Sequence, residues 1–356
     1  IYGNDRSTPF PYPAMQHEPY VQALGERLRK AGVKPHTNSM GIDLGPGGKC
    51  IRCKTCDGFV CKIDAKSDAE VNALNPAIVT GHVTLMASVQ VNRIVLSEDK
   101  KSVSHLEAAR NGEPLEIYGK NFVISAGSVN TAALLLRSGV ANSSDQVGRN
   151  FMMHNNSHIA AVDMRRKNDV TFQKTLSFTD WYLDGGKGYP LGAVQLIGKV
   201  QGIMMKSFAK RVPLPLLNLV SDHSVEFVVM SEDLPHPDNR VTIDKNGAIK
   251  IVRKSVGMKT HFELLRRAKK VLRKTGYQAI FRQPFDISMN SHQCGTTVAG
   301  NDPRTSVVDG YCRSHDHHNL YLIDGGFFPS SAAMNPALTI AAQALRVVAE
   351  SDLAKV

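Results

Sequence analysis

One stretch near the C-terminus decides how the chain is interpreted: residues 320–340, with the sequence LYLIDGGFFPSSAAMNPALTI. Its first four residues are apolar and predict a short buried strand, which the acidic turn at Asp324 ends. Asn335 is a good N-cap and Pro336 a good first helical residue, because proline has no amide hydrogen bond to lose there. A helix is predicted over residues 337–350, with apolar residues at helical spacing at Leu338, Ala341, Leu345 and Val348. The start of such a helix favours an anion or an electron-rich ring edge, although an ordinary strand-to-helix crossover has the same pattern.

The composition suits about two domains, or one large one, in a chain of 356 residues. No apolar run is long enough to span a bilayer, so we expect no transmembrane segment. The formal net charge is +11, and much of it lies in residues 259–274, where apolar residues at helical spacing predict an amphipathic helix. Its basic face is either solvated or a docking face for an acidic partner or a membrane surface. We do not expect nucleic acid as a partner, because no nucleic-acid motif is present.

Four of the six cysteines lie in one short loop, and these are Cys50, Cys53, Cys56 and Cys61. Thiolates at this spacing could hold an iron–sulfur cluster, although the spacing differs from the bacterial ferredoxin run. They could also close a tetrahedron around a structural zinc ion. A loop with free thiols, or with one disulfide, is the alternative without a metal.

A second strand-to-helix turn is predicted at residues 121–139. The strand ends in the small residues Ser125-Ala126-Gly127, and Ser128 is predicted to cap a helix that Gly139 ends. In α/β sheets such a turn makes room for a phosphate or a nucleotide, although close packing alone also explains small residues at this point.

The middle of the chain differs in pattern from its two ends. Strand-like runs recur between turn signals, at residues 158–164, 193–200, 224–230, 240–243 and 249–252. We therefore predict an antiparallel α+β part over residues 151–290, between α/β parts at residues 1–150 and 291–356.

Several motifs occur together in a fixed order. They are Ser125-Ala126-Gly127, Ser231-Glu232-Asp233-Leu234-Pro235 with Asn239-Arg240-Val241, His292 with Gly295-Thr296, and Asp324-Gly325 with Asn335-Pro336 and Thr339-Ile340. In this combination the chain resembles the flavin-dependent oxidoreductases of the glucose–methanol–choline (GMC) family, over about residues 20–350. The cysteine-rich loop and the Asn335-Pro336 ending are most similar to the sugar and polyol branch, near pyranose oxidase and gluconate and fructose dehydrogenases.

The resemblance implies a fold and a reaction. Residues 1–150 and 291–356 would form a Rossmann-like α/β FAD-binding domain, and residues 151–290 an α+β antiparallel-sheet substrate domain. The reaction would be oxidation of an alcohol, such as a sugar or polyol hydroxyl, by hydride transfer to FAD. His292 resembles the active-site histidine that acts as base, and Asn335 its partner. The residues that resemble FAD contacts are Val91, Ala126, Gly127, Asp324, Gly325, Asn335, Pro336 and Thr339.

The residue types suit this chemistry. A histidine near its ordinary pKa can take the hydroxyl proton, and general base catalysis of this kind contributes about 10²–10⁴-fold. Asn335 can donate a hydrogen bond to the developing alkoxide. The helix that begins near Pro336 would direct its positive end toward the flavin edge that gains electrons.

The chain departs from the family at its start. The family normally begins with a strand and the glycine motif GxGxxG that holds the FAD diphosphate, whereas this chain begins at Ile1 and contains no complete motif of this kind. We expect this N-terminal FAD-binding segment to be missing from the sequence, or to be supplied by a separate chain, in an oligomer. Alone, the sheet would lack its central strand and would expose edges and apolar surface. The alternatives are a non-redox lyase on the same scaffold and a flavin-free binding or partner subunit.

Overall fold

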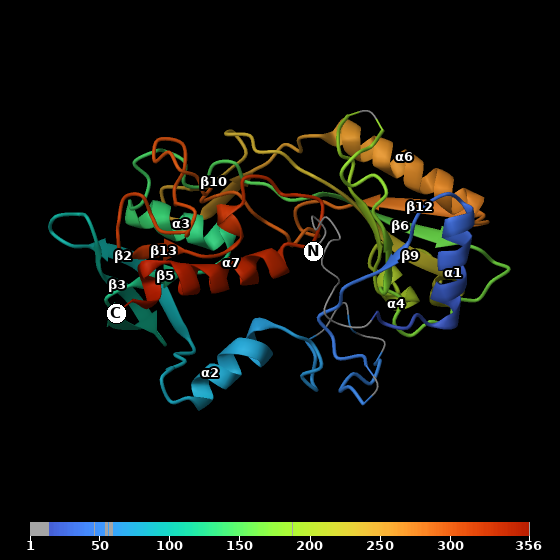
Figure 1. Ribbon diagram of the computed structural model, residues 1–356, viewed down its shortest axis with the longest axis horizontal. Helices are drawn as coiled ribbons and strands as arrows, with labels where there is room; N and C mark the ends of the chain where they lie inside the picture. The colour runs from blue at the N-terminus through green and yellow to red at the C-terminus, as the bar shows by residue number, and fades with distance from the viewer. Residues whose placement is uncertain (1–13, 46, 54–55, 57–59, 187, 356) are drawn as a thin grey trace. The chain divides into compact units, whose positions relative to one another are not determined.

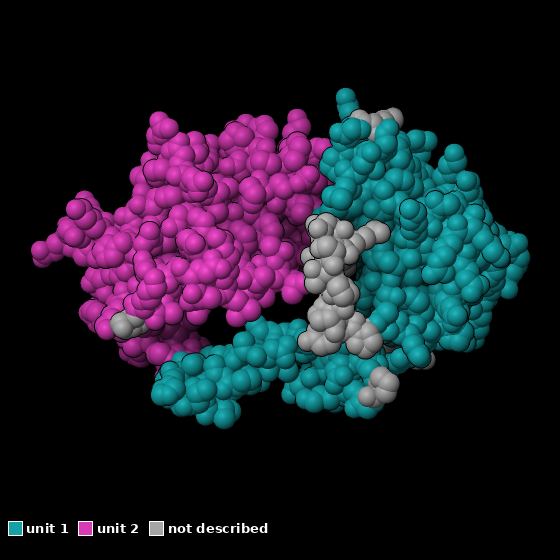
Figure 2. All heavy atoms as spheres, viewed as in Figure 1, with its two compact units in different colours: residues 1–85, 156–231, 259–285 teal, residues 86–155, 232–258, 286–356 magenta. Residues whose placement is uncertain are grey.

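The computed structural model describes residues 14–355, except 46, 54–55, 57–59 and 187. The chain divides into two compact units, which are coloured separately in Figure 2, and each is assembled from three stretches of sequence. Unit 1 consists of residues 1–85, 156–231 and 259–285, and unit 2 consists of residues 86–155, 232–258 and 286–356. These units follow different boundaries from the predicted domains 1–150, 151–290 and 291–356, which remain a prediction.

Unit 1 is organised around a six-stranded sheet with the strand order β1-β7-β8-β9-β6-β12, of which Figure 1 labels β9, β6 and β12. The strands are β1 (His36–Thr37), β7 (Leu176–Phe178), β8 (Ala193–Leu196), β9 (Ser224–Ser231), β6 (Asn155–Val162) and β12 (Ala279–Pro284). The pairs β1–β7, β7–β8, β8–β9 and β6–β12 are antiparallel. This sheet agrees with the antiparallel part that the sequence predicts.

Two long helices pack on the core of unit 1, α1 (Pro19–Lys30) and α6 (Met258–Lys274). Leu24 and Leu28 of α1 are fully buried, and so is Leu264 of α6. These side chains join one apolar cluster with residues of β6, β7, β8 and β9. The amphipathic helix predicted over residues 259–274 is confirmed, and its basic residues Lys259, Arg266, Lys270, Arg273 and Lys274 are exposed. Shorter helical segments complete the unit: a π-helix (Glu70–Leu74), α2 (Asn75–Val79), α4 (Gly202–Met205) and α5 (Leu214–Asp222).

Three arginines hold the carboxyl end of α6. Arg27 and Arg166 each donate to the carbonyl of Thr275 at 3.4 Å, and Arg165 donates to the carbonyl of Gly276 at 2.7 Å. Cations are favourable here because the last carbonyls of a helix are unpaired and carry partial negative charge. The three stretches of unit 1 therefore meet at this helix end.

Unit 2 contains three small sheets. They are β2-β3-β4, the pair β10-β11 and the pair β13-β5. The strands are β2 (Val89–Leu96), β3 (Val103–Arg110), β4 (Glu113–Tyr118), β5 (Phe122–Ile124), β10 (Arg240–Ile243), β11 (Ile249–Val252) and β13 (Leu320–Leu322). Strands β5 and β13 are parallel, with Leu320 opposite Phe122 and Leu322 opposite Ile124. Helix α3 (Ser128–Ser138) follows β5. Fourteen residues, 323–336, separate β13 from α7 (Ala337–Glu350), and they include the 3-10 turn η2 (Gly325–Phe327).

Two predicted helix caps are wrong by one residue. Gly127, with φ of 84°, precedes α3 as its N-cap, and Ser128 is the first helical residue, with its hydroxyl 2.8 Å from that of Thr296. Pro336 is the N-cap of α7, and its carbonyl accepts from the amide of Ile340 at 3.0 Å. Asn335 therefore lies outside the helix. The bounds predicted for α7 are confirmed.

The two sides of α7 differ in burial. Ile340, Ala344 and Val347 pack against the core of unit 2. The side chains of Leu338, Leu345 and Val348 are 57%, 73% and 52% exposed. A helix that is apolar on both sides normally belongs to an interior, so the outer side of α7 is suited to contact with another element.

None of the helices in the described residues is long and apolar enough to cross a membrane.

Candidate active site

The parallel pair β5-β13 brings two predicted turns together. Parallel strands end at the same edge of a sheet, so Ser125-Ala126-Gly127 after β5 adjoins Asp324-Gly325 after β13. Ser125, Ala126 and Gly127 are exposed. This edge is where α/β sheets bind ligands, because helix amino ends and small residues leave backbone amides accessible.

Asp324 joins the two turns to each other. Its carboxylate accepts from the Thr131 hydroxyl at 2.5 Å and from the Gly326 amide at 2.7 Å, and its side chain is buried. Burial raises the pKa of Asp324, while the hydrogen bonds from Thr131, Gly326 and Gly127 act in the opposite direction. Since both oxygens are occupied by the protein, this carboxylate fixes the start of α3 against the end of β13.

Gly325 and Gly326 allow a third segment to pack closely on this turn. A Cβ atom added to Gly325 would lie 2.7 Å from the carbonyl oxygen of Gln293. The amides of Gly295 and Thr297 donate to the carbonyls of Gly325 and Gly326 at 3.2 and 3.0 Å. The segment that follows His292 is therefore bonded to the turn that carries Asp324.

His292 is half-buried on this segment. Its Nδ1 atom is buried and has no hydrogen-bond partner within the described residues. Burial lowers the pKa of His292 below its ordinary value, so the imidazole is neutral at neutral pH. Its ring contacts that of His154 in a T-shaped arrangement, with the centroids 4.9 Å apart.

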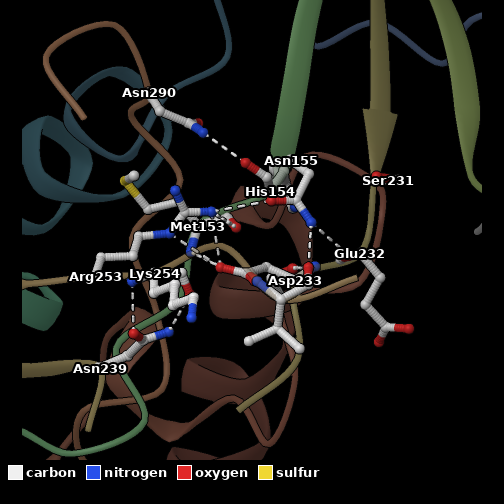
Figure 3. A network of polar contacts seen from close by, with 12 residues as sticks. Met153, His154, Asn155, Ser231, Glu232, Asp233, Asn239, Arg253, Lys254 and Asn290 are labelled. Carbon is white, nitrogen blue, oxygen red and sulfur yellow. Dashed lines mark hydrogen bonds and ion pairs between the residues drawn. The ribbon is translucent and has the colours of Figure 1, made fainter. Parts of the chain in front are cut away.

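His154 links the segment of His292 to the loop before α7, and Figure 3 shows its bond to Asn290 of that segment. Its Nδ1 atom donates to the carbonyl of Ala332 at 3.0 Å, and its own carbonyl accepts from the Asn290 side chain at 2.7 Å. Its Nε2 atom, like Nδ1 of His292, is buried with no partner in the part of the chain that the structure describes. The pKa of His154 is lowered to about 3, chiefly by burial and also by His292 and Arg253, while the hydrogen bond to Ala332 acts in the opposite direction.

A buried ion pair supports the backbone on both sides of His154 (Figure 3). Arg253 donates to Asp233 at 2.8 and 3.0 Å, to the carbonyl of Met153 at 3.2 Å and to the Asn155 side chain at 3.2 Å. Asp233 also accepts from the amides of Val256 at 2.8 Å and Met153 at 3.4 Å. Burial raises the pKa of Asp233, and the facing Arg253 opposes that rise.

The same network holds the loop that leads to Asn335. The Ser331 hydroxyl accepts from the amide of Asp233 at 2.8 Å, and Ser330 bonds to Glu232. Asn335 and Thr339 are exposed and Pro336 is half-buried, all at the start of α7. The structure thus joins the loops of His292 and Asn335 through His154 and Asp233.

Val91 and the cysteines lie in other parts of the chain. Val91 is half-buried on β2, a strand that packs against α3. Cys53 is exposed, and Cys50, Cys56 and Cys61 are partly buried. Residues 54–55 and 57–59 of this loop lie outside the described residues, and the described ones include no group of three or more metal-binding side chains. The metal site stays a prediction.

A small cavity of about 150 Å³ lies elsewhere in unit 2, between the segments around Tyr311 and Asp352. It contains none of the predicted site residues.

Sequence reasoning missed His154, and it did not assign a site role to Asp233 or Arg253. The available signal was the polar run from His154 to His158, which is unusual at the start of a largely buried strand. A polar run in such a strand indicates that its side chains have specific partners.

Comparisons with known proteins agree with this geometry. Residues 14–156 and 235–344 match two family models that are both described as GMC oxidoreductase. The chain is 30% identical to paromamine 6'-oxidase of Streptomyces fradiae, over 92% of this chain and 63% of that protein. It is 26% identical to the fructose dehydrogenase large subunit of Gluconobacter japonicus, over 96% of this chain and 67% of that protein.

A solved structure shows the same fold. Pyridoxine 4-oxidase from Mesorbium loti superimposes with a TM-score of 0.63 at 18% identity, over 95% of this chain and 70% of that one. The chain spans 63% and 64% of the length of two of its curated relatives, paromamine 6'-oxidase and the 6'''-hydroxyparomomycin C oxidase of Streptomyces lividus. With both family models matched in order along the sequence, the chain belongs to the GMC oxidoreductase family.

Proposed function

We propose that the protein is an FAD-dependent oxidoreductase that oxidises a CH–OH group of a sugar or polyol. The observation that carries this proposal is His292, a half-buried imidazole on a segment bonded to the turn at Asp324. The named relatives support the substrate class, since they include an oxidase of the aminoglycoside paromamine and a fructose dehydrogenase subunit.

His292 would act as the general base. Its pKa is lowered by burial, so the neutral form that can accept a proton dominates at neutral pH. The proton of the substrate hydroxyl would pass to one nitrogen of this imidazole, while the Asn335 amide donates to the oxygen that becomes negative. FAD, when bound, accepts the hydride from the carbon.

The residues at the β5-β13 edge fit a dinucleotide. Ala126 and Gly127 are exposed directly before the amino end of α3, where backbone amides favour a diphosphate. Pro336 and Thr339 lie at the amino end of α7, where the helix dipole favours an electron-rich ring. Asp324 and Gly325 would shape this site by holding its turns, because the carboxylate of Asp324 is already bonded within the protein. Val91 would contact the adenine from β2.

The test is reduction of bound flavin under anaerobic conditions by a pool of sugars and polyols. We expect His292→Ala to slow this reduction by about 10²–10⁴-fold, because the base is lost. The exposed His318 provides the matched control, and His318→Ala should leave the rate unchanged. Equal rates for His292→Ala and the unmodified protein would reject His292 as the base.

The same spectra separate the alternatives. Bleaching of the flavin by substrate would reject the non-redox lyase. A flavin-free binding subunit would be rejected by a flavin spectrum in the purified native protein.

We further propose that unit 2 receives a β-strand and helix that carry the glycine motif, from an N-terminal segment or a separate chain. This proposal is supported by exposed apolar side chains on two elements of unit 2. They are Leu338, Leu345 and Val348 on α7 and Val123 on β5. A two-stranded parallel sheet is also rarely stable without further strands, since parallel sheets are normally covered on both faces. Mass spectrometry of the native FAD-containing particle tests the proposal. A particle with stoichiometric FAD, a chain of 356 residues and no second polypeptide would reject it.

The cysteine loop defines a separate test. An iron–sulfur cluster at Cys50, Cys53, Cys56 and Cys61 would carry electrons to another redox partner, and zinc would be structural. Iron and zinc analysis after anaerobic purification distinguishes them, and the absence of both metals would leave free thiols or a disulfide.

A further inference from the structure

The geometry points to His154 as a positioning residue that holds the imidazole of His292 in one tautomer and fixes the loop before Asn335. This inference rests on the proposed function and adds a residue to the same site. It is carried by the contacts of a side chain that is 1% exposed.

The tautomer of His154 follows from its hydrogen bond. The carbonyl oxygen of Ala332 can only accept, so the Nδ1 atom 3.0 Å away must carry the hydrogen. In the neutral ring Nε2 is then an acceptor. With a pKa of about 3, His154 remains neutral at any pH at which the enzyme would work.

His292 requires a hydrogen-bond acceptor close to its Nδ1 atom if it is to act as a base through Nε2. A histidine that takes a proton on Nε2 must carry hydrogen on Nδ1 beforehand, and this buried Nδ1–H then needs an acceptor. The ring in contact with it, that of His154, has an equally unpartnered acceptor at Nε2. Leaving both buried atoms unpaired is unfavourable, which favours pairing them directly or through one water.

This pairing leaves Nε2 of His292 as the base. The substrate proton would move to Nε2, and the Nδ1–H bond to His154 would persist in the imidazolium. His154 does not change its protonation in this step. The charged groups near His154 are Arg253 and Asp233, which neutralise each other. The pair of histidines, His154 and His292, therefore gains only the charge of the transferred proton.

His154 also sets the position of both loops. Ala332, which its ring holds, lies three residues before Asn335, and Asn290, which donates to its carbonyl, lies two residues before His292. A displacement of about 1 Å between catalytic groups can cost about 10²-fold in rate. The His154 side chain therefore determines both the tautomer of His292 and the position of His292 relative to Asn335.

The experiment is ¹⁵N NMR of the protein with labelled histidine, in which the His292 signals are assigned by their loss in His292→Gln. We expect the unmodified protein to show neutral His292 protonated on Nδ1. In His154→Phe, which keeps the ring volume without either nitrogen, we expect a mixture of tautomers. His158→Phe removes a different buried histidine and should leave the His292 signals unchanged.

Two further variants keep the test decisive if His154→Phe does not fold. His154→Asn retains a donor for Ala332 but lacks the Nε2 acceptor, so it should also shift the tautomer. His154→Gln places an amide near the position of Nε2 and should restore the signals in part. The inference is overturned if neutral His292 carries its hydrogen on Nε2, or if its signals are the same in His154→Phe or His154→Asn as in the unmodified protein.

Activity supplies an independent second readout. In flavin reduction by substrate, His154→Phe should lower kcat by about 10²-fold with little change in KM, since substrate binding groups remain. If His292→Ala reduces flavin normally, the proposed role of His292 as base fails, and if no substrate reduces the flavin of the unmodified protein, the proposed function fails. In either case the NMR result still decides whether His154 controls the tautomer of His292.

Discussion

Unit 1 and unit 2 bury their helices to different extents. In unit 1, Leu24 and Leu28 of α1 are fully buried against a six-stranded sheet. In unit 2, Leu345 of α7 is 73% exposed, and the parallel sheet beside that helix has two strands among the described residues. The difference indicates that α1 is covered within unit 1, whereas α7 of unit 2, beside the candidate active site, keeps a surface suited to a further element.

The buried aspartates of the two units provide the sharpest test of this difference. Asp233 of unit 2 pairs with Arg253, whose side chain is 12% exposed, whereas Asp163 of unit 1 pairs with Arg165 and Arg166, which are 58% and 39% exposed. We expect Asp233→Ala to lower the free energy of unfolding by about 3–5 kcal/mol, because it leaves a buried charge unpaired. Asp163→Ala should cost less, since its arginines can return to water.

Urea unfolding of both variants measures these effects, with Asp233→Asn as a control that keeps one acceptor. Equal losses for Asp163→Ala and Asp233→Ala would show that the two pairs are equally enclosed. The ion pair beside His154 would then stabilise the protein no more than the more exposed pair of unit 1 does.

Matched leucines test the burial of the helices themselves. Leu24→Ala should lower the free energy of unfolding by about 2–5 kcal/mol, because it opens a cavity in the core of unit 1. Leu345→Ala should change it by about 0.5 kcal/mol or less, as at other exposed positions. Thermal unfolding followed by circular dichroism provides the measurement. A large loss for Leu345→Ala in the 356-residue chain would mean that the outer side of α7 is covered in solution.

Glu226 gives unit 1 a pH dependence that can be isolated. This carboxyl is fully buried on β9, and burial raises its pKa to about 7, although Gln173, Ser224 and Lys199 favour the charged form. Between the unfolded pKa of 4.5 and about 7 the folded protein binds more protons, so the stabilising effect is present at low pH and is lost as pH rises.

We therefore compare the change in the free energy of unfolding that Glu226→Gln causes at two pH values. This change should be up to about 3 kcal/mol more stabilising at pH 8 than at pH 4. Guanidinium unfolding at the two pH values measures the difference. The buried His261 has a pKa lowered to about 4, so its effect on stability has the opposite pH dependence. It is present in both the unmodified protein and Glu226→Gln, and its effect therefore cancels in the comparison. An effect that does not change with pH would show that Glu226 titrates normally.

Long periodic elements could be predicted from the sequence. The helices α6 and α7 occur where apolar spacing placed them, and β13 occurs where a short apolar run ends at Asp324. Strand β3 was missed because its exposed positions carry polar residues and its buried ones include alanine, which weakens the alternation. Residues around Val83 and Leu85 resemble a strand in composition, but they are exposed and precede β2, because no neighbouring strand pairs with them.

The candidate site was predictable in its separate motifs but not in their connections. His292, Asn335 and Asp324 each belong to a recognisable local pattern. His154 has no such pattern, because its role depends on contacts with residues 292 and 332 that are distant in the sequence. The packing of Gln293 on Gly325 is equally long-range, and only the fold brings these residues together.

The arginines at the end of α6 have a consequence for biosynthesis. Arg27 leaves the ribosome 248 residues before its partner Thr275. At a synthesis rate of about 5–20 residues per second, that interval is roughly 10–50 s. Throughout it, the apolar side of α1 has no α6 to pack against. Arg27 can therefore reach its partner only after residue 275 has been made, so this part of unit 1 completes its packing late in translation.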